Sequence, residues 1–301
     1  MNLFRHAVRT LLLSGLVAGT AIAAEGPWVT DWEAAKAQAA KEKKTLLIDF
    51  SGSDWCSWCI KLDKEVFAQD AFQAVAKDKY VMVLLDYPRD KSGQSEELQA
   101  QNKKLQKEFQ VRGYPSVYLA TADGAPFAKT GYQAGGPEAY LKHLDGFMAK
   151  RAEVAKLEAS LANAKGLERA KVLDELCTKM TMDTPKKAAY AAEILTLDAD
   201  NKAGLKSKYL AKKMMQEAMG LLQQRKSDEA KAVLDKALAL EGLPADGRQE
   251  VLFLKSQVLF GAGDKKGAKA MLIAAVKLAP ATDTAERIGE ILKKPFFKDV
   301  E

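Results

Sequence analysis

The sequence predicts a two-part chain: an α/β domain with a central sheet flanked by helices over residues 25–150, and an all-α domain of helical repeats over residues 151–301. In the first part, apolar runs of strand length alternate with helix-like segments, an order typical of a layered α/β domain. In the second part, strand-like runs give way to Ala, Leu, Lys and Glu. The length of 301 residues also favours two domains over one.

The first 24 residues have the pattern of a secretory signal peptide. Arg5 and Arg9 precede an apolar stretch, residues 11–22, and Ala21-Ile22-Ala23 is typical of a cleavage site. The stretch is shorter than the ~20 residues that cross a bilayer. We therefore expect residues 1–24 to be a signal peptide and the mature protein to be exported.

The α/β part contains four strand-like runs, at residues 45–50, 80–86, 116–120 and 126–130. Between and before them, helical patterns predict helices over residues 30–43, 55–68, 70–76 and 95–110. Thr30 and Glu33 form a capping box at the start of the first of these helices. After the last strand, two glycines interrupt the chain before a final helix that begins near Pro137.

Two segments of the all-α part are similar to each other. Residues 230–240 and 268–278 align in register, 38 residues apart, and residues 194–201 look like the end of an earlier copy. Small alanines at close-packing positions resemble tetratricopeptide repeats, whose usual period is ~34 residues. A generic Ala-rich helical bundle is the alternative. We favour the repeats, and we expect this domain to bind a protein partner or to form a dimer.

A cysteine pair follows the first strand directly, in Trp55-Cys56-Ser57-Trp58-Cys59. Three-residue spacing on a helix puts both sulfurs on one face, where they can form a disulfide. Cys56 lies at the expected start of the helix, where unpaired N–H groups and the positive helix end stabilise a thiolate. A purely structural disulfide across so short a loop adds little stability. The pattern therefore favours a dithiol that exchanges electrons with other dithiols.

A second segment, Val111-Arg-Gly-Tyr-Pro-Ser-Val117, precedes the third strand. Together with the Trp-Cys-x-x-Cys centre, it resembles the two landmarks of the thioredoxin superfamily, in the family's order. The segment Phe-Ser-Gly-Ser-Asp-Trp-Cys is similar to the corresponding segment of exported bacterial thioredoxin-like proteins. The resemblance implies a thioredoxin-like fold, a thiol–disulfide oxidoreductase activity, and a cis peptide bond before Pro115, which packs against the dithiol.

The resemblance also implies three catalytic residues. Cys56 is the attacking thiol, and Cys59 resolves the mixed disulfide that forms. Asp49, an acid in an apolar strand, helps to move the proton of Cys59, and burial raises the pKa of such a carboxyl. It stands one residue further from the centre than in the usual family pattern. A carboxylate satisfied by a nearby lysine is the alternative interpretation of Asp49.

Five residues are candidates for substrate binding. Trp55 and Trp58 flank the sulfurs, and Tyr114, Pro115 and Ser116 are expected to line a groove in which backbone groups pair with an extended peptide. Core packing is the alternative for Tyr114.

For the other residues near the cysteine pair, and for the other cysteine and histidine, we expect no catalytic role. We interpret Asp54 and Lys61 as solvated surface residues and Cys177 as a buried apolar residue of a helix. His143 is the only histidine after residue 24, so a site of several imidazoles or a Cys–His nucleophile is not supported. The net charge of +6 is dispersed, without the arginine clusters typical of nucleic-acid binding. We expect no cofactor, no metal and no nucleic acid.

The sequence thus predicts an exported, bacterial periplasmic thiol–disulfide oxidoreductase. Its substrates would be cysteines of other exported proteins, and a redox partner protein would supply or accept its electrons. We favour a reductase over an oxidase or an isomerase. The alternative is a non-catalytic adaptor, or a module that delivers a soft metal ion such as Cu(I) through the cysteine pair.

Overall fold

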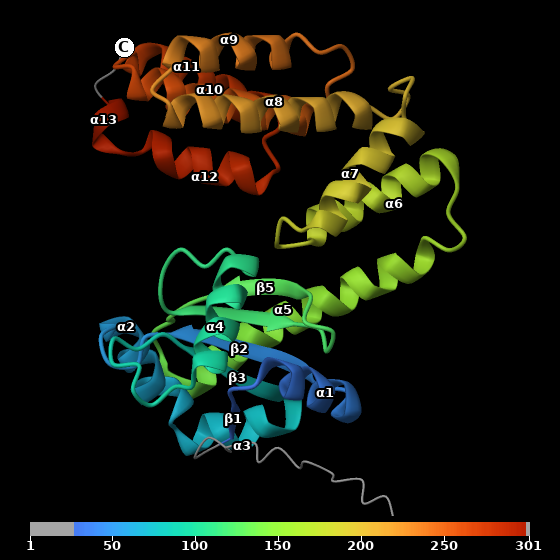
Figure 1. The fold of residues 1–301 in the computed structure, drawn as a ribbon. Coiled ribbons are helices and arrows are strands. Elements are labelled where there is room, and N and C mark those ends of the chain that lie inside the picture. Colours follow the sequence, from blue (N-terminus) through green and yellow to red (C-terminus); the bar gives the residue numbers. More distant parts are fainter. Residues whose placement is uncertain (1–26, 299–301) are drawn as a thin grey trace, which may run out of the picture. The chain divides into compact units, whose positions relative to one another are not determined.

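The computed structural model describes residues 27–298, so the expected signal peptide, residues 1–24, lies outside the described range (Figure 1). Two compact units divide between Leu141 and Lys142. This division falls inside helix α5 (Gly136–Ser160), which continues beyond it. The domain limits of 25–150 and 151–301 therefore remain a prediction.

The first unit contains a five-stranded sheet in the order β1-β3-β2-β4-β5. β1 (Trp28–Val29), β3 (Tyr80–Asp86) and β2 (Thr45–Ser51) are parallel, and β4 (Ser116–Ala120) and β5 (Pro126–Thr130) continue the sheet antiparallel. The four predicted strands are confirmed as β2, β3, β4 and β5, and β2 is one residue longer than predicted. The sequence did not predict β1, because two residues are too few for a periodic pattern.

Three helices of this unit lie where the sequence predicts them: α1 (Trp32–Glu42), α3 (Asp70–Lys79) and α4 (Glu96–Glu108). α1 packs against β2 and β3, and α3 packs against β3. The predicted capping box at Thr30 and Glu33 is wrong by one residue. The side chain of Asp31 caps α1 instead, accepting the N–H of Ala34 at 2.7 Å. Asp and Thr are both good caps, so two adjacent candidates are hard to separate by sequence.

The predicted helix over residues 55–68 is shorter and consists of two parts. α2 (Ser57–Leu62) is a regular helix, and the π-helical turn η1 (Asp63–Phe67) continues it. Insertions of this kind are frequent at functional sites. Here the π-helical turn begins at Asp63, one helical turn after Cys59.

The two faces of the sheet have separate aromatic cores. On one face, the ring of Phe50 lies 5.2 Å from that of Phe109. On the other, Tyr140 of α5 lies 5.6 Å from Phe67 of η1. Neighbouring residues of a strand point to opposite faces, so Asp49 points to the face opposite Phe50, where Tyr140 lies. The fold therefore places a carboxyl in an apolar layer.

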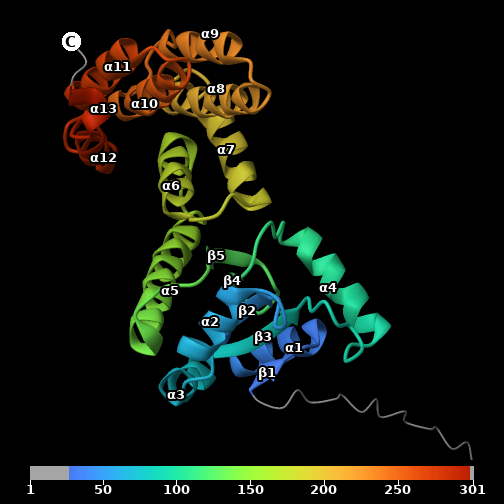
Figure 2. The ribbon, with the colours of Figure 1, turned by 90° about the vertical axis from the view of Figure 1, so that its left-hand side faces the viewer.

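From α6 onward the described residues are helical (Figure 2), and none of the helices within residues 27–298 is long and apolar enough to cross a membrane. Successive helices pack in pairs, α6 with α7, α8 with α9, and α10 with α11. Their bounds are α6 (Gly166–Lys179), α7 (Pro185–Leu197), α8 (Leu205–Gln223), α9 (Ser227–Leu238), α10 (Ala245–Gly261), α11 (Lys265–Leu278), α12 (Asp283–Leu292) and α13 (Pro295–Lys298).

The two similar segments of the sequence lie on α9 and α11 and bury matching positions. Three positions of α9 and the three positions 38 residues later are each at most 1% exposed: Ala230, Leu234 and Ala237, then Ala268, Leu272 and Ala275. An internal repeat explains why equivalent residues face the core in both helices. Its assignment as tetratricopeptide-like stays a prediction.

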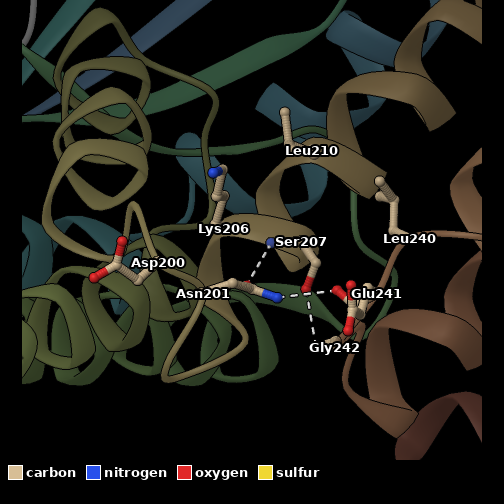
Figure 3. Close-up of a pocket in the computed structure, with 8 residues that line it drawn as sticks. All are labelled: Asp200, Asn201, Lys206, Ser207, Leu210, Leu240, Glu241 and Gly242. Carbon is tan, nitrogen blue, oxygen red and sulfur yellow. Dashed lines mark hydrogen bonds between the residues drawn. The ribbon is translucent and has the colours of Figure 1, made fainter.

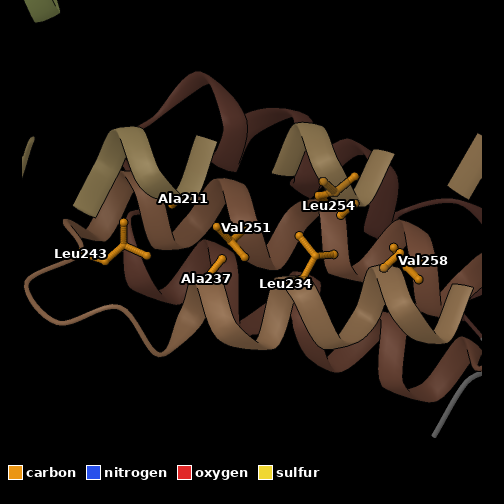
Figure 4. Packing of buried hydrophobic residues seen from close by; sticks show 9 residues of the cluster. Ala211, Leu234, Ala237, Leu243, Val251, Leu254 and Val258 are labelled. Carbon is orange, nitrogen blue, oxygen red and sulfur yellow. The ribbon is translucent and has the colours of Figure 1, made fainter. Parts of the chain in front are cut away.

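The packing of α9 gives a direct stability test. Leu234 lies in a core cluster with side chains of α8 and α10, among them Ala211 and Val251 (Figure 4). Truncation leaves a cavity, so Leu234→Ala should lower the free energy of unfolding of this unit by about 3 kcal/mol, measured by chemical denaturation. The exposed Lys236 on the same helix is the control, and Lys236→Ala should change this free energy by less than about 0.5 kcal/mol. Equal effects of the two substitutions would contradict the described packing.

Candidate functional site

The cysteine pair lies at the junction of β2 and α2, after a turn over residues 52–55. Cys56 is the N-cap residue of α2, and a disulfide joins it to Cys59 with the two Cα atoms 5.2 Å apart. The backbone N–H of Cys59 donates to Sγ of Cys56 at 3.2 Å. The first sulfur therefore receives a free N–H of the helix start, an arrangement that favours a thiolate once the disulfide is reduced.

Both cysteines are largely covered. Cys56 is 6% exposed and Cys59 is 3% exposed, so the first cysteine is the more accessible of the two, as the sequence predicts, but only by a small margin. Their positions on the helix distinguish them more clearly. Cys56 occupies the cap, and Cys59 lies within the first turn, where its side chain packs inward.

The peptide bond between Tyr114 and Pro115 is cis, as the resemblance implies. The side chain of Tyr114 reaches the dithiol turn, with its ring 5.5 Å from that of Trp55 in an edge-on arrangement. Tyr114 is half-buried, and its hydroxyl lies 2.5 Å from Nε2 of Gln106, which donates to it. The structure thus brings the two sequence landmarks together.

Ser116 differs from the expectation of a groove-lining side chain. It is 4% exposed, and its hydroxyl donates to the carbonyl of Gly113 at 2.7 Å. Ser116 also pairs in register with Phe50 at the start of β4. The side chain stabilises the turn before Pro115 and does not face solvent.

The two tryptophans beside the sulfurs are exposed, Trp55 by 37% and Trp58 by 53%. The ring of Trp58 lies 5.2 Å from that of Tyr132, and the ammonium of Lys61 lies about 5 Å from both rings (5.2 and 5.0 Å). The hydroxyl of Tyr132 bonds to Glu65 at 2.5 Å. Sequence reasoning missed Tyr132, since only the pairing of β5 with β4 brings a residue so distant in the chain to the dithiol.

Asp49 is 5% exposed, and its Oδ1 is fully buried and accepts no hydrogen bond. Burial and, to a smaller extent, the nearby carboxylates of Asp63 and Asp86 together raise the pKa of Asp49 to about 8. The charges that act on Asp49 are therefore negative. Within residues 27–298, nothing supports the alternative in which a lysine satisfies it.

The residues around Asp49 share its environment. Tyr140 is fully buried, its hydroxyl donates to the carbonyl of Gly131 at 3.2 Å, and burial together with Asp49 raises its pKa. Partial desolvation raises the pKa of Asp63, which lies one helical turn after Cys59. Asp49 lies in the buried part of β2, and the turn of residues 52–55 separates this strand from Cys56.

The third cysteine, Cys177, lies in the helical unit. Cys177 is 5% exposed in a core cluster of the helical unit, burial raises the pKa of its thiol, and its Sγ lies 3.7 Å from the carbonyl of Lys187. Among residues 27–298, no group of three or more His, Cys, Asp or Glu side chains is arranged to hold a metal ion.

A cavity of about 460 Å³ lies in the helical unit, between the turn before α8 and the turn after α9 (Figure 3). Ser207 donates to the carbonyl of Gly242 at 2.9 Å, and Asn201 donates to the carbonyl of Glu241 at 3.0 Å. These polar groups join successive helical pairs. The cavity therefore lies where successive helical pairs meet. Its lining residues are Asp200, Asn201, Lys206, Ser207, Leu210, Leu240, Glu241 and Gly242.

Comparisons with known proteins identify relatives of the first unit. A family model described as thioredoxin-like matches residues 27–122. Disulfide bond reductase DsbH of Chlamydia pneumoniae is 33% identical over 113 residues, which cover 36% of this chain and 68% of DsbH. Thioredoxin-related protein DsbJ of the same organism is 32% identical over 92 residues, which cover 31% of this chain and 26% of DsbJ. A solved structure of DsbH oxidoreductase is 27% identical, covers 44% of this chain and 95% of its own, and has a TM-score of 0.39.

Proposed function

The chain belongs to the thioredoxin-like family and is a thiol–disulfide oxidoreductase, and on this premise we propose that it reduces disulfides of other exported proteins. The observation that carries the proposal is the buried Asp49 carboxyl on the sheet strand that leads into the Cys56–Cys59 pair. DsbH, a relative of which this chain covers 68%, is named a disulfide bond reductase.

The reaction we propose begins at Cys56. Its thiolate attacks one sulfur of a substrate disulfide, a mixed disulfide forms, and the other substrate sulfur leaves as a thiolate. The thiolate of Cys59 then attacks Sγ of Cys56, so that the second substrate thiol leaves and the Cys56–Cys59 disulfide closes. The substrate gains two electrons and the protein loses two. The N-cap position of Cys56 supports its role as the attacking thiol.

Asp49 supplies the proton acceptor in this scheme. The thiol of Cys59 must lose a proton before it can attack, and a base acts best when its pKa is near the working pH. Burial brings the pKa of Asp49 to about 8, far above that of an ordinary aspartate. Ionised Asp49 can therefore take the proton of Cys59, and the neutral acid cannot.

The charges around the pair favour a reductase. Asp63 and Asp86 act on the buried Asp49 through their charges, and we expect the same negative charges to oppose a thiolate at the pair. The cations Lys61 and Arg89 lie over the rings of Trp58 and Trp55 and are exposed, so water screens them. A centre whose reduced form is poorly stabilised holds its electrons weakly and is a good reductant.

Trp55, Trp58, Tyr114 and Pro115 form the proposed substrate surface, with Ser116 acting through the turn that it stabilises. The exposed indoles offer apolar contact, and the segment before β4, beside the cis proline, offers backbone groups to an extended peptide. Cysteine-containing exported proteins are the proposed substrates, and a second redox protein resupplies the electrons.

The location and the helical unit complete the proposal. The N-terminal sequence pattern supports export, and we place the protein in the bacterial periplasm. Helical pairs stacked in series present broad surfaces, which supports a role of this unit in holding a protein partner or a second copy.

The reduction potential of the Cys56–Cys59 pair tests the direction of electron flow. After equilibration of the full mature chain with glutathione, we expect a value near about −270 mV, as for thioredoxin. A value near about −120 mV would show an oxidant and overturn the reductase proposal, while leaving the oxidoreductase activity intact.

Asp63→Asn removes one of the negative charges that oppose a thiolate at the pair. It should therefore make the reduction potential less negative, and Asp78→Asn, at an exposed position, is the matched control.

A further inference from the structure

Two loops beside the disulfide are joined by hydrogen bonds that take no part in the reaction proposed above. The first is residues 51–55, which run from the last residue of β2 to the residue before Cys56, and the second is residues 86–90, which begin at the last residue of β3. We call these two segments together the clasp.

Asp86 ties the two loops at one end of the clasp. Its Oδ1 accepts the backbone N–H of Ser53 at 2.9 Å, and its Oδ2 accepts the hydroxyl of Ser53 at 2.6 Å. The N–H of Tyr87 donates to the carbonyl of Ser51 at 2.9 Å. The backbone leading to Cys56 is therefore anchored from the side as well as by the sheet.

Asp54 ties the loops at the other end. Both of its carboxylate oxygens lie 3.0 Å from the backbone nitrogen of Arg89, and Oδ2 also accepts the N–H of Asp90 at 3.0 Å. These two N–H donors hold the pKa of Asp54 below its usual range. The interpretation of Asp54 as a merely solvated residue is thus incomplete, because its side chain is exposed but crosses between the loops.

The clasp immobilises the indole of Trp55. Its Nε1–H donates to the carbonyl of Tyr87 at 2.8 Å, and the guanidinium of Arg89 lies 5.9 Å from the ring centre. Gly52 leaves the space beneath the ring, since a Cβ there would lie 2.5 Å from the indole. The ring of Tyr114, 5.5 Å away, is a neighbour from outside the clasp, but the hydrogen bond and the cation that hold the indole both come from residues 86–90.

We infer that Asp54 is a positioning residue for thiol–disulfide exchange, which holds residues 86–90 against Trp55 and so presents the indole to a substrate peptide. The inference rests on the proposed function. Asp54 acts through Trp55, and its removal should therefore affect a peptide substrate much more than a small reagent. Asp86 serves the same clasp but also raises the pKa of Asp49, which makes Asp54 the cleaner position for a test.

The test compares Asp54→Ala with Asp90→Ala in the full chain. Asp90 is a matched control, because it is an exposed acid of the facing segment whose carboxylate accepts the N–H of Ser92, two residues further on, and none from residues 51–55. Three quantities are measured: the reduction by the pre-reduced protein of a short peptide in mixed disulfide with glutathione, the reduction of the Cys56–Cys59 disulfide by dithiothreitol, and the hydrogen exchange of the Trp55 indole N–H by NMR.

We expect Asp54→Ala to lower the second-order rate constant for the peptide about tenfold, as small misplacements at a reaction site do, and to speed indole exchange. The dithiothreitol rate should stay within about twofold of wild type, and Asp90→Ala should resemble wild type in all three measurements. Asp54→Asn keeps one carbonyl oxygen and should lie between the two.

Other outcomes are equally decisive. An unchanged peptide rate, or an equal loss with dithiothreitol, would overturn the positioning role. If the wild-type protein reduces no peptide, the proposed function fails, and the exchange of the indole N–H then still decides whether Asp54 holds Trp55.

Discussion

Replacing Cys56 with serine should reduce the rate of peptide disulfide reduction to the rate measured without protein. A hydroxyl cannot form the mixed disulfide through which the electrons pass. Replacing Cys59 should have a different effect, because Cys56 can still attack but nothing releases it. With Cys59→Ser we therefore expect a covalent complex of protein and substrate to accumulate, visible as an added mass that a reducing agent removes.

The matched control for both substitutions is Cys177→Ser. Cys177 lies in a core cluster of the helical unit, so its loss should leave the exchange rate close to that of wild type. If Cys56→Ser retained turnover while Cys177→Ser lost it, the reaction would have to be reassigned to the helical unit.

The second large effect concerns Asp49, whose pKa is about 8 in the folded protein against 3.8 for an ordinary aspartate. Below pH 3.8 the carboxyl is protonated in the folded and the unfolded protein alike. Between pH 3.8 and 8 only the unfolded protein releases the proton, so the stability falls as the pH rises, by about 1.4 kcal/mol per pH unit from this group. Asp49→Asn removes this loss, and it should raise the free energy of unfolding by several kcal/mol at pH 8 but hardly at pH 4.

Denaturation curves of wild type, Asp49→Asn and Asp78→Asn, recorded at several pH values, check this expectation. Asp78 is exposed on α3, so the same chemical change there should leave the pH dependence as in wild type. A constant difference between Asp49→Asn and wild type from pH 4 to pH 8 would show that the pKa of Asp49 is not raised. Turnover provides a second readout, because its rise near pH 8 should disappear in Asp49→Asn, with a loss of about a hundredfold above that pH.

Much of the α/β unit is predictable from the sequence because its signals are local. The runs at residues 80–86, 116–120 and 126–130 are strands with those same limits, since short apolar runs between turn signals have few other stable arrangements. The limits of the helices are less well predicted. Adjacent capping residues compete at the start of α1, and the π-helical turn after Leu62 has no local signature.

Local patterns of the sequence were enough to predict the chemistry, whereas the surroundings of the proposed site residues became visible only in the folded chain. The Cys56–Cys59 spacing and the Tyr114-Pro115 segment are local patterns, and they were sufficient to predict the family. Burial, with Asp63 and Asp86, raises the pKa of Asp49, and Tyr87 and Arg89 contact the indole of Trp55. Asp49 and Asp86 lie 37 residues apart in the chain, and the parallel pairing of β2 with β3 brings them together. Burial and long-range contacts are properties of the folded chain, so no local pattern records them.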